Sequence, residues 1–136
     1  MASKDTHLSI IRHNYSCLEY LSIRETEFID WCVTIIFYMA LHYLHAFFDK
    51  KKLHPNGYND LFRYIEEDVR IRRIVQKIKN LRDDSWSARY TGEKLSIYEL
   101  RNSVLVWFND IQDVIKNLLN IPENQTYNLH DLFSLN

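Results

Sequence analysis

Residues 28–50 read FIDWCVTIIFYMALHYLHAFFDK, and this stretch decides the fold. Apolar residues follow one another along it in steps of three and four, which is the spacing of a helix face. Two such stripes run side by side, so the helix is apolar on most of its circumference and has to be buried by its neighbours. The sequence therefore predicts a central helix over about 25–53. Its first stripe is Phe28, Trp31, Ile35, Tyr38, His42 and His45, and its second is Cys32, Ile36, Met39, Tyr43 and Ala46.

Three more stretches have apolar residues at helical spacing, over 6–21, 59–88 and about 99–119. The stripe of the stretch 59–88 changes phase around Val69, which indicates a break near the acidic residues 66–68. The last stretch carries the stripe Leu100, Val104, Trp107, Ile111, Val114 and Leu118.

Two S-x-x-E capping boxes, Ser22–Glu25 and Ser96–Glu99, predict the starts of the central and last helices. Two glycines and two prolines are too few to supply the turns of a sheet-rich fold. We therefore expect an all-α fold, an antiparallel bundle of four main helices, or five if the third is split. The length favours a single domain over 1–120, with a tail at 121–136 that is irregular or docks on the bundle.

Composition narrows the possible functions. The formal net charge of −1 gives no overall attraction to nucleic acids or anionic membranes, so such binding needs a local patch. No apolar run of about 18 residues is present, and we expect no membrane span. Cys17 and Cys32 make no disulfide framework and no secretion signal precedes them, which favours a cytoplasmic protein. None of the glycine-rich nucleotide-binding motifs occurs, and we expect no cofactor.

The stretch 69–82 reads VRIRRIVQKIKNLR and contains no acidic residue. On a helix its cations form two rows beside the apolar stripe, and such rows can follow the phosphates of RNA. The alternative is a solvated face neutralised by acids at either end of the stretch. The candidate RNA-binding residues are Arg70, Arg73 and Lys77 in one row and Arg72, Lys79 and Arg82 in the other.

His42, His45 and Asp49 stand at i, i+3 and i+7 on one face of the central helix. This spacing is compatible with a metal site. With no fourth ligand nearby, we expect no metal, and core or interface histidines are the competing interpretation. Of the functional roles, a general acid–base role is favoured, because imidazole titrates near neutrality.

Two arginines stand at helix ends. Arg89 and Tyr90 lie where the third helix meets its loop, where such a pair can grip a phosphate or stack on a base. Arg89 can equally be a structural arginine that pairs with a carboxylate. Arg101 and Asn102 lie on the first turn of the last helix, and the same alternative holds for Arg101 at the margin of its apolar stripe.

The order of several motifs resembles the HEPN domain family, as found in short prokaryotic proteins. Members carry a buried helix of the pattern W-x-x-T-x-x-F-Y-x-A-L-H, then a His-Pro turn, then S-x-x-A-R-Y, then Arg-Asn opening the last helix. The resemblance spans about residues 8–119. The matching residues are Trp31, Thr34, Phe37, Tyr38, Ala40, Leu41 and His42, then His54 and Pro55, then Ser85, Ala88, Arg89 and Tyr90, then Arg101 and Asn102.

The resemblance implies an antiparallel helical bundle, commonly dimeric. Active members are metal-independent ribonucleases of toxin–antitoxin and phage-defence systems. Their motif is an arginine, often followed by asparagine or another polar residue, and then a histidine four to six residues further on. Histidine manages protons as the RNA 2′-OH attacks, and arginine stabilises charge on phosphorus. Arg101 and Asn102 match the first half of that motif, but the sequence VWF at 106–108 contains no histidine. Tyr58 also stands where relatives often place another histidine after the His-Pro turn.

Three functions remain open. The first is a HEPN-like RNA-binding or scaffolding domain without standard ribonuclease activity, and the second is an active endoribonuclease with a relocated proton carrier. The third is a protein-interaction module that pairs with a nucleotidyltransferase-type partner. We also expect a homodimer that buries the last helix near Arg101 and Trp107, since a half-buried arginine needs an acceptor. The candidate proton carriers are His42, His45, His54 and Tyr90.

Overall fold

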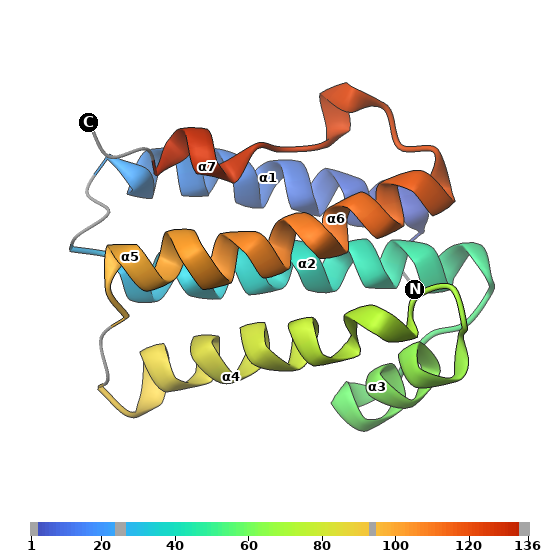
Figure 1. Cartoon of the computed structure of the whole chain (residues 1–136). Helices are drawn as coiled ribbons and strands as arrows, with labels where there is room; N and C mark the ends of the chain where they lie inside the picture. Colours follow the sequence, from blue (N-terminus) through green and yellow to red (C-terminus); the bar gives the residue numbers. More distant parts are fainter. Residues whose placement is uncertain (1–2, 24–26, 93–94, 134–136) are drawn as a thin grey trace.

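The computed structural model describes residues 3–23, 27–92 and 95–133. Within those ranges every regular element is helical and no strand occurs, which confirms the all-α prediction (Figure 1). The main helices are α1 (Lys4–Ser22), α2 (Ile29–Lys50), α3 (Gly57–Glu67), α4 (Val75–Tyr90) and α6 (Leu105–Leu119). The shorter elements are η1 (Arg72–Ile74), α5 (Ile97–Glu99), the π-turn η2 (Leu100–Val104), η3 (Glu123–Gln125) and α7 (Leu129–Leu132).

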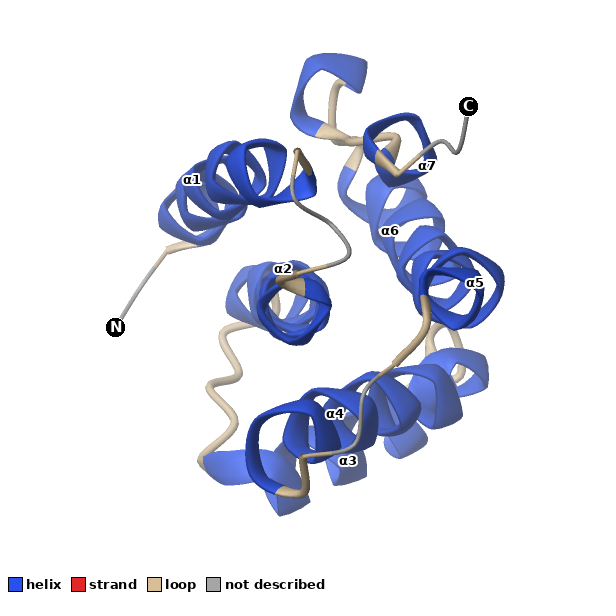
Figure 2. Ribbon diagram, turned by 90° about the vertical axis from the view of Figure 1, so that its left-hand side faces the viewer, coloured by secondary structure: helices blue, strands red, loops and turns tan. Residues whose placement is uncertain are grey.

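Helix α2 is the predicted central helix, with α1, α4 and α6 around it (Figure 2). Its second stripe is fully buried, but its first stripe is not, because the surrounding helices leave that side partly uncovered. Trp31 is 52% exposed, and Ile35 and Tyr38 are only partly buried. One predicted stripe of α2 is thus core, and the other is only partly buried.

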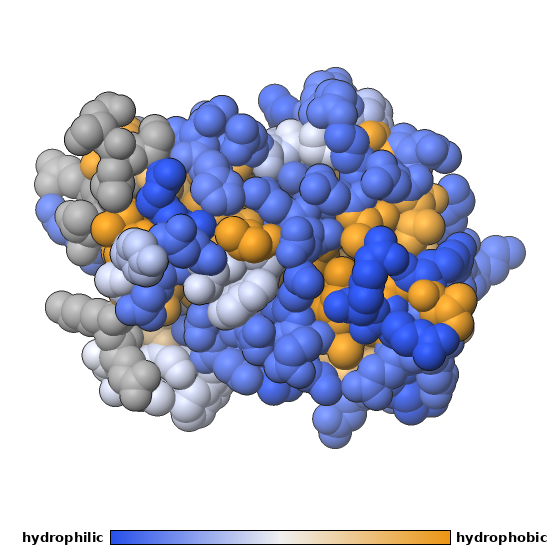
Figure 3. Space-filling view, viewed as in Figure 1, coloured by the Kyte–Doolittle hydropathy of each residue, from blue (hydrophilic) through white to orange (hydrophobic). Residues whose placement is uncertain are grey.

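By length and composition α2 is also long and apolar enough to cross a membrane. In this fold 72% of its most apolar window is buried by the other helices. The core helix of a soluble protein meets the same criteria. The outer face over α4 and α6 is mostly hydrophilic, with small separate apolar patches (Figure 3).

One capping box is confirmed and the other is wrong. The Ser96 hydroxyl oxygen accepts the Glu99 backbone N–H at 3.1 Å and donates to the Glu99 carboxylate at 3.2 Å. Ser22 instead ends α1, and its hydroxyl donates to the carbonyl of Glu19 at 2.8 Å. Glu25 lies outside the described residues. Helix α2 therefore begins later than predicted, at Ile29.

The third predicted helix is split at Asp68 into α3 and α4. The buried Asp68 carboxylate accepts the backbone N–H of Arg70 at 2.9 Å and pairs with the side chains of Arg70 and Lys51. The Arg70 guanidinium and the Lys51 ammonium hold the pKa of Asp68 far below its ordinary value. Because a turn replaces the helix here, Val69 is 70% exposed and does not join the predicted core stripe.

The π-turn η2 changes the buried face of the last helix. A π-turn inserts one extra residue into a helix, which moves the buried stripe one position along the chain. Of the predicted stripe, Leu100, Val104 and Ile111 are fully buried, whereas Trp107, Val114 and Leu118 are only partly buried. The residues that follow each of them are buried instead, namely Phe108, Ile115 and Leu119.

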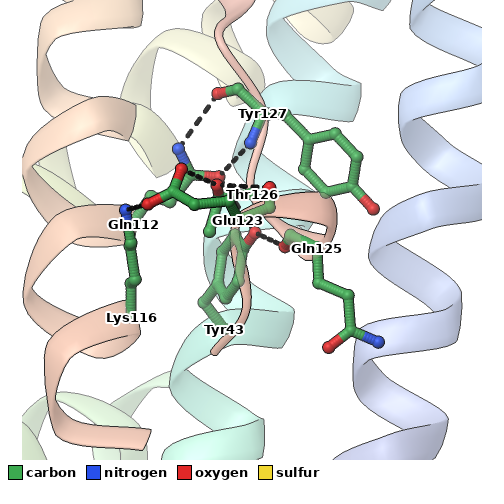
Figure 4. Close-up of polar contacts among 7 residues, drawn as sticks. All are labelled: Tyr43, Gln112, Lys116, Glu123, Gln125, Thr126 and Tyr127. Atoms are coloured by element: carbon green, nitrogen blue, oxygen red, sulfur yellow. Dashed lines mark hydrogen bonds and ion pairs between the residues drawn. The ribbon is translucent and has the colours of Figure 1, made fainter. Parts of the chain in front are cut away.

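The segment after Leu119 is pinned to the bundle by a buried amide (Figure 4). Gln112 of α6 accepts the Tyr43 hydroxyl and the Tyr127 backbone N–H, both at 2.9 Å, through its side-chain oxygen. Its side-chain nitrogen donates to the Tyr127 carbonyl at 3.0 Å. Further along, Leu129 and Phe133 are fully buried.

Candidate functional site

Most cations of the basic stretch are neutralised by acids. Arg70 lies in the turn before η1, so the two rows predicted along one continuous helix are cut short. Lys77 faces α6, whereas Lys79 faces α3. The ion pairs are Arg70–Asp68 at 3.0 Å, Lys77–Asp110 at 3.5 Å, Lys79–Glu66 at 3.2 Å and Arg82–Asp83 at 3.0 Å.

Arg72 and Arg73 differ from these paired cations. Both lie in η1, both are exposed, and neither forms an ion pair with a described residue. Their charges are therefore available to a partner, whereas the paired side chains first have to give up an acid.

A surface cavity of about 530 Å³ lies where α3 meets α4. Arg82, Trp86 and Arg89 line it from α4, where spacings of four and three residues put them on one helix face. Tyr58 lines it from the first turn of α3. The remaining lining residues are Asp83 and Ser87.

Arg82 rests on the aromatic rings of α3. Its guanidinium carbon lies 4.8 Å from the centre of the Phe62 ring and 5.9 Å from that of Tyr58. These are cation–π distances, so the rings hold the guanidinium against the wall of the cavity. The stacking and the ion pair to Asp83 together hold the Arg82 guanidinium in place.

Arg89 reaches the same cavity without a carboxylate partner among the described residues. Its Nε–H donates to the carbonyl of Ser85 at 3.1 Å, and an Nη1–H donates to the Tyr38 hydroxyl at 3.5 Å. Its guanidinium also lies 5.2 Å from the Tyr90 ring centre. The carboxylate pairing considered for Arg89 is therefore absent here, and neutral groups hold the charge in place.

Exposed aromatic rings stand beside these two arginines. Trp86 is 54% exposed, and its ring centre lies 5.3 Å from that of Tyr90. Tyr58 and Tyr90 are exposed as well. Aromatic rings together with guanidinium groups are the surfaces on which unpaired RNA bases stack.

The histidines of α2 belong to a separate cluster. The Nδ1 atoms of His7 and His42 lie 2.9 Å apart, and the His7 ring stacks on His45 with 5.4 Å between the ring centres. At that distance one imidazole has to donate and the other accept, so the pair shares one proton. Burial lowers the pKa of all three groups, and that of His42 falls to about 4 with help from His7 and His45.

Asp49 and His54 lie near this cluster. His54 Nδ1 is 4.0 Å from the Asp49 carboxylate, whose other oxygen accepts the backbone N–H of Lys4 at 2.7 Å. Within the described ranges no three histidine, cysteine or acidic side chains form a group that could hold a metal ion.

Arg101 and Asn102 stand in the π-turn and bond to their own chain. The Arg101 guanidinium donates to the carbonyl of Phe133, in the segment that follows α7. The Asn102 side-chain amide donates to the carbonyl of Tyr98 at 2.9 Å. The acceptor that a partner protomer was expected to give Arg101 is therefore supplied within the chain.

His130 of α7 is the histidine that contacts Arg101. Its Nε2 lies 3.2 Å from the Arg101 carbonyl, and its Nδ1 lies 3.0 Å from the side-chain nitrogen of Asn109. With these partners, Nε2–H donates to the carbonyl and Nδ1 accepts from the amide. Both nitrogens then take part in holding the C-terminal segment.

Apart from the cations between Arg70 and Lys79, the predicted site residues fall into three places, namely the histidine cluster, the turn around Arg101 and the cavity. Helix α2 ends where α3 begins, at the end of the bundle away from α5, so His54 and Arg101 lie toward opposite ends (Figure 1). Arg82, Arg89 and Tyr90 are brought together at the cavity.

Sequence reasoning missed Trp86, His7 and His130. Trp86 carries a usable signal, since it lies four residues after Arg82 and three before Arg89 on one helix face. His7 could also have been found, because two consecutive helices that fold back about a turn near residue 25 pair residues whose numbers sum to about 50. His130 gives no such signal, since it lies outside the main helices. No family model, curated protein or solved structure matches this chain.

Proposed function

We propose that this chain is an RNA-binding domain of the HEPN type, an antiparallel bundle of four main helices whose third is split into α3 and α4, and that it contacts RNA at the α3–α4 cavity. The observation that carries the proposal is the convergence of Arg82 and Arg89 with exposed aromatic rings around one cavity. Guanidinium groups bind phosphates and the rings take bases, which together make an RNA-binding surface. A cytoplasmic location and a toxin–antitoxin or phage-defence setting belong to the same proposal through the HEPN resemblance.

Because several of the cations are paired with acids, RNA affinity should depend only moderately on salt concentration. Of the candidate RNA-binding cations, Arg72, Arg73 and Arg89 have no acidic partner among the described residues, while Arg70, Lys77, Lys79 and Arg82 are paired. Three phosphate contacts to a single strand, one at the cavity through Arg89 and two outside it through Arg72 and Arg73 of η1, predict a slope of about −2 for log K against log salt. A helix with all its cations available would give a steeper slope.

The direct test is RNA affinity in fluorescence anisotropy as a function of salt. The variant carries Arg82→Gln and Arg89→Gln, and the matched control carries Arg12→Gln on α1 and Arg63→Gln on the non-lining side of α3. We expect the first pair to weaken binding about tenfold or more and to flatten the salt dependence. Equal losses in both variants would show that the protein has no localised RNA site.

A second candidate is the metal-independent endoribonuclease, for which the contact between His130 and Arg101 is the favourable observation. This histidine comes from the C-terminal segment, whereas the HEPN motif has its histidine in the last helix, where this chain has the sequence VWF at 106–108. Incubation of a labelled RNA pool in EDTA, with wild type beside Arg101→Ala and His130→Ala, tests it. Cleavage lost in both variants would establish the nuclease, and intact RNA with the wild type would exclude it.

A protein-interaction module is the third candidate, favoured by the half-exposed first stripe of α2. A nucleotidyltransferase-type partner bound through apolar contacts would respond little to salt. The homodimer proposed through the last helix keeps the partly exposed Val106 and Trp107 as its surface, but no longer needs Arg101. Light scattering at tens of micromolar tests it, and a monomer would contradict it.

A further inference from the structure

The cavity offers more than charge, because one of its walls is an indole ring. Trp86 lines the cavity, and 54% of its surface is exposed, so part of the indole ring is open to a ligand. Tyr90 contacts both Trp86 and Arg89, with distances of 5.3 Å between ring centres and 5.2 Å from ring centre to guanidinium. A flat apolar surface and a charged donor group are therefore held side by side by one tyrosine.

The guanidinium of Arg89 is placed before any ligand arrives. The Ser85 carbonyl takes its Nε–H, and the Tyr38 hydroxyl lies 3.5 Å from Nη1. Arginine has five N–H donors in a fixed plane, so donors remain for a phosphate after these contacts. Because neutral groups hold it, the full positive charge is directed at the ligand.

The cavity has the size of a small-molecule site. Its volume of about 530 Å³ falls within the range of about 300–1,000 Å³ that is usual for ligand pockets. A helical duplex keeps its bases stacked inside, and the deep groove of an RNA helix excludes side chains. A base therefore reaches Trp86 only from a strand that is unpaired at that position.

We propose that the cavity holds one unpaired RNA base, stacked on the Trp86 indole, with the adjacent phosphate bound by Arg89. The ligand class is then single-stranded RNA, such as a loop, a bulge or a strand end. This inference rests on the proposed function and specifies its ligand. Arg82, stacked on Phe62 and Tyr58, supplies a second guanidinium plane at the same cavity.

The experiment compares the full chain binding a labelled single-stranded RNA of about ten nucleotides with the same strand annealed to its complement. Trp86→Ala removes the stacking surface, Trp86→Phe retains part of it, and Tyr98→Ala removes an exposed tyrosine outside the lining. We expect the single strand to bind about tenfold or more tightly than the duplex, and Trp86→Ala to cost the single strand about 5- to 100-fold. Trp86→Phe should lose less, and Tyr98→Ala should bind as wild type does.

Two outcomes separate the inference from the function beneath it. If single strand and duplex bind equally, or Trp86→Ala binds as wild type does, RNA binding stands and the base-stacking site is wrong. If neither RNA binds, the proposed function fails together with the inference.

Discussion

Arg89 and Arg101 occupy contrasting regions of this molecule, although the sequence makes both of them candidates for RNA. Arg89 lies at a cavity, held by a carbonyl and a tyrosine hydroxyl, and its charge has no acidic partner among the described residues. Arg101 donates to the Phe133 carbonyl and so ties the C-terminal segment to the bundle. Both guanidinium groups keep donors after these bonds, and neither has an acidic partner among the described residues. The difference lies in their surroundings, because Arg89 lines a cavity beside exposed aromatic rings, whereas Arg101 is part of the contact that holds the C-terminal segment.

The same contrast holds for the groups around each arginine. Near Arg89 stand Trp86 and Tyr90, which are exposed and able to stack. Near Arg101 stands His130, whose ring bonds to the Arg101 carbonyl and to the Asn109 side chain and so joins the C-terminal segment to the bundle. The region around Arg89 thus has exposed groups that can bind a ligand, whereas the polar groups around Arg101 hold the C-terminal segment.

The largest expected effect concerns the tail. Gln112→Leu leaves the buried N–H and C=O of Tyr127 without partners, which should lower the free energy of unfolding by about 2–4 kcal/mol. Urea denaturation measures this loss, and limited proteolysis should cut the segment after Leu119 sooner. RNA affinity of the folded fraction should stay unchanged, since the cavity lies elsewhere.

The matched control for that change is Lys116→Gln, which breaks the exposed ion pair to Glu123 in the same segment. An exposed ion pair contributes little, so its effect on unfolding should be far smaller than that of Gln112→Leu. If Gln112→Leu weakens RNA binding as much as it weakens folding, the tail and the cavity are not independent regions.

The next effect comes from the histidine cluster. Burial depresses the pKa of His42 from about 6.5 to about 4, so the unfolded chain takes up its proton first as the pH falls. Stability is then fully present above pH 6.5 and is lost between about pH 6.5 and 4. His7 and His45 shift in the same direction, and after allowance for partial exposure we expect a total loss of about 1–3 kcal/mol.

Urea denaturation at a series of pH values measures this loss. His42→Gln should flatten the dependence, whereas His13→Gln, on the same helix as His7, should leave it intact. RNA affinity near pH 7 should be the same in both variants. If only His42→Gln lost RNA affinity, the histidine cluster would take part in RNA binding, and the cavity beside Arg89 would not be the sole RNA site.

The smallest expected effect tests the role of the acidic residue at the cavity. Among the described residues, Asp83 is the carboxylate that lines the cavity, and Asp83→Asn removes it and releases Arg82 from its ion pair. We expect RNA affinity to rise about two- to threefold at low salt, and the salt slope to steepen by about 0.7, as one more phosphate contact requires. Asp60→Asn on α3 is the control, and an equal gain there would mean a change in overall charge only.

Helical periodicity predicts most of the fold but not which apolar stripe is covered. Trp31 and Cys32 are neighbours on adjacent stripes of α2, and only the packing of three other helices makes Cys32 core and leaves Trp31 half exposed. The break at Asp68 was visible as a phase shift, because the apolar pattern itself changes there. The sequence did not show that Phe108 instead of Trp107 is buried, because the π-turn that changes the buried face has no local sequence signal.

The candidate site was only partly predictable for a related reason. Acids of other helices neutralise Lys77 and Lys79, which the sequence does not show, whereas Arg82 pairs with Asp83, the next residue in the sequence. The sequence around Arg101 contains no sign that a residue 32 positions later supplies its acceptor. Contacts between distant segments are set by tertiary packing, which single-sequence patterns do not encode.

The measurement that tests the central claim most directly is single-stranded RNA affinity for Arg89→Gln beside Arg101→Gln. Both changes remove one positive charge from a partly buried arginine, so net charge is matched. We predict that Arg89→Gln weakens binding about tenfold, while Arg101→Gln stays within about twofold of wild type and loses about 1 kcal/mol of stability. An Arg101→Gln loss equal to or larger than that of Arg89→Gln would contradict the account and move the RNA site to the start of the last helix.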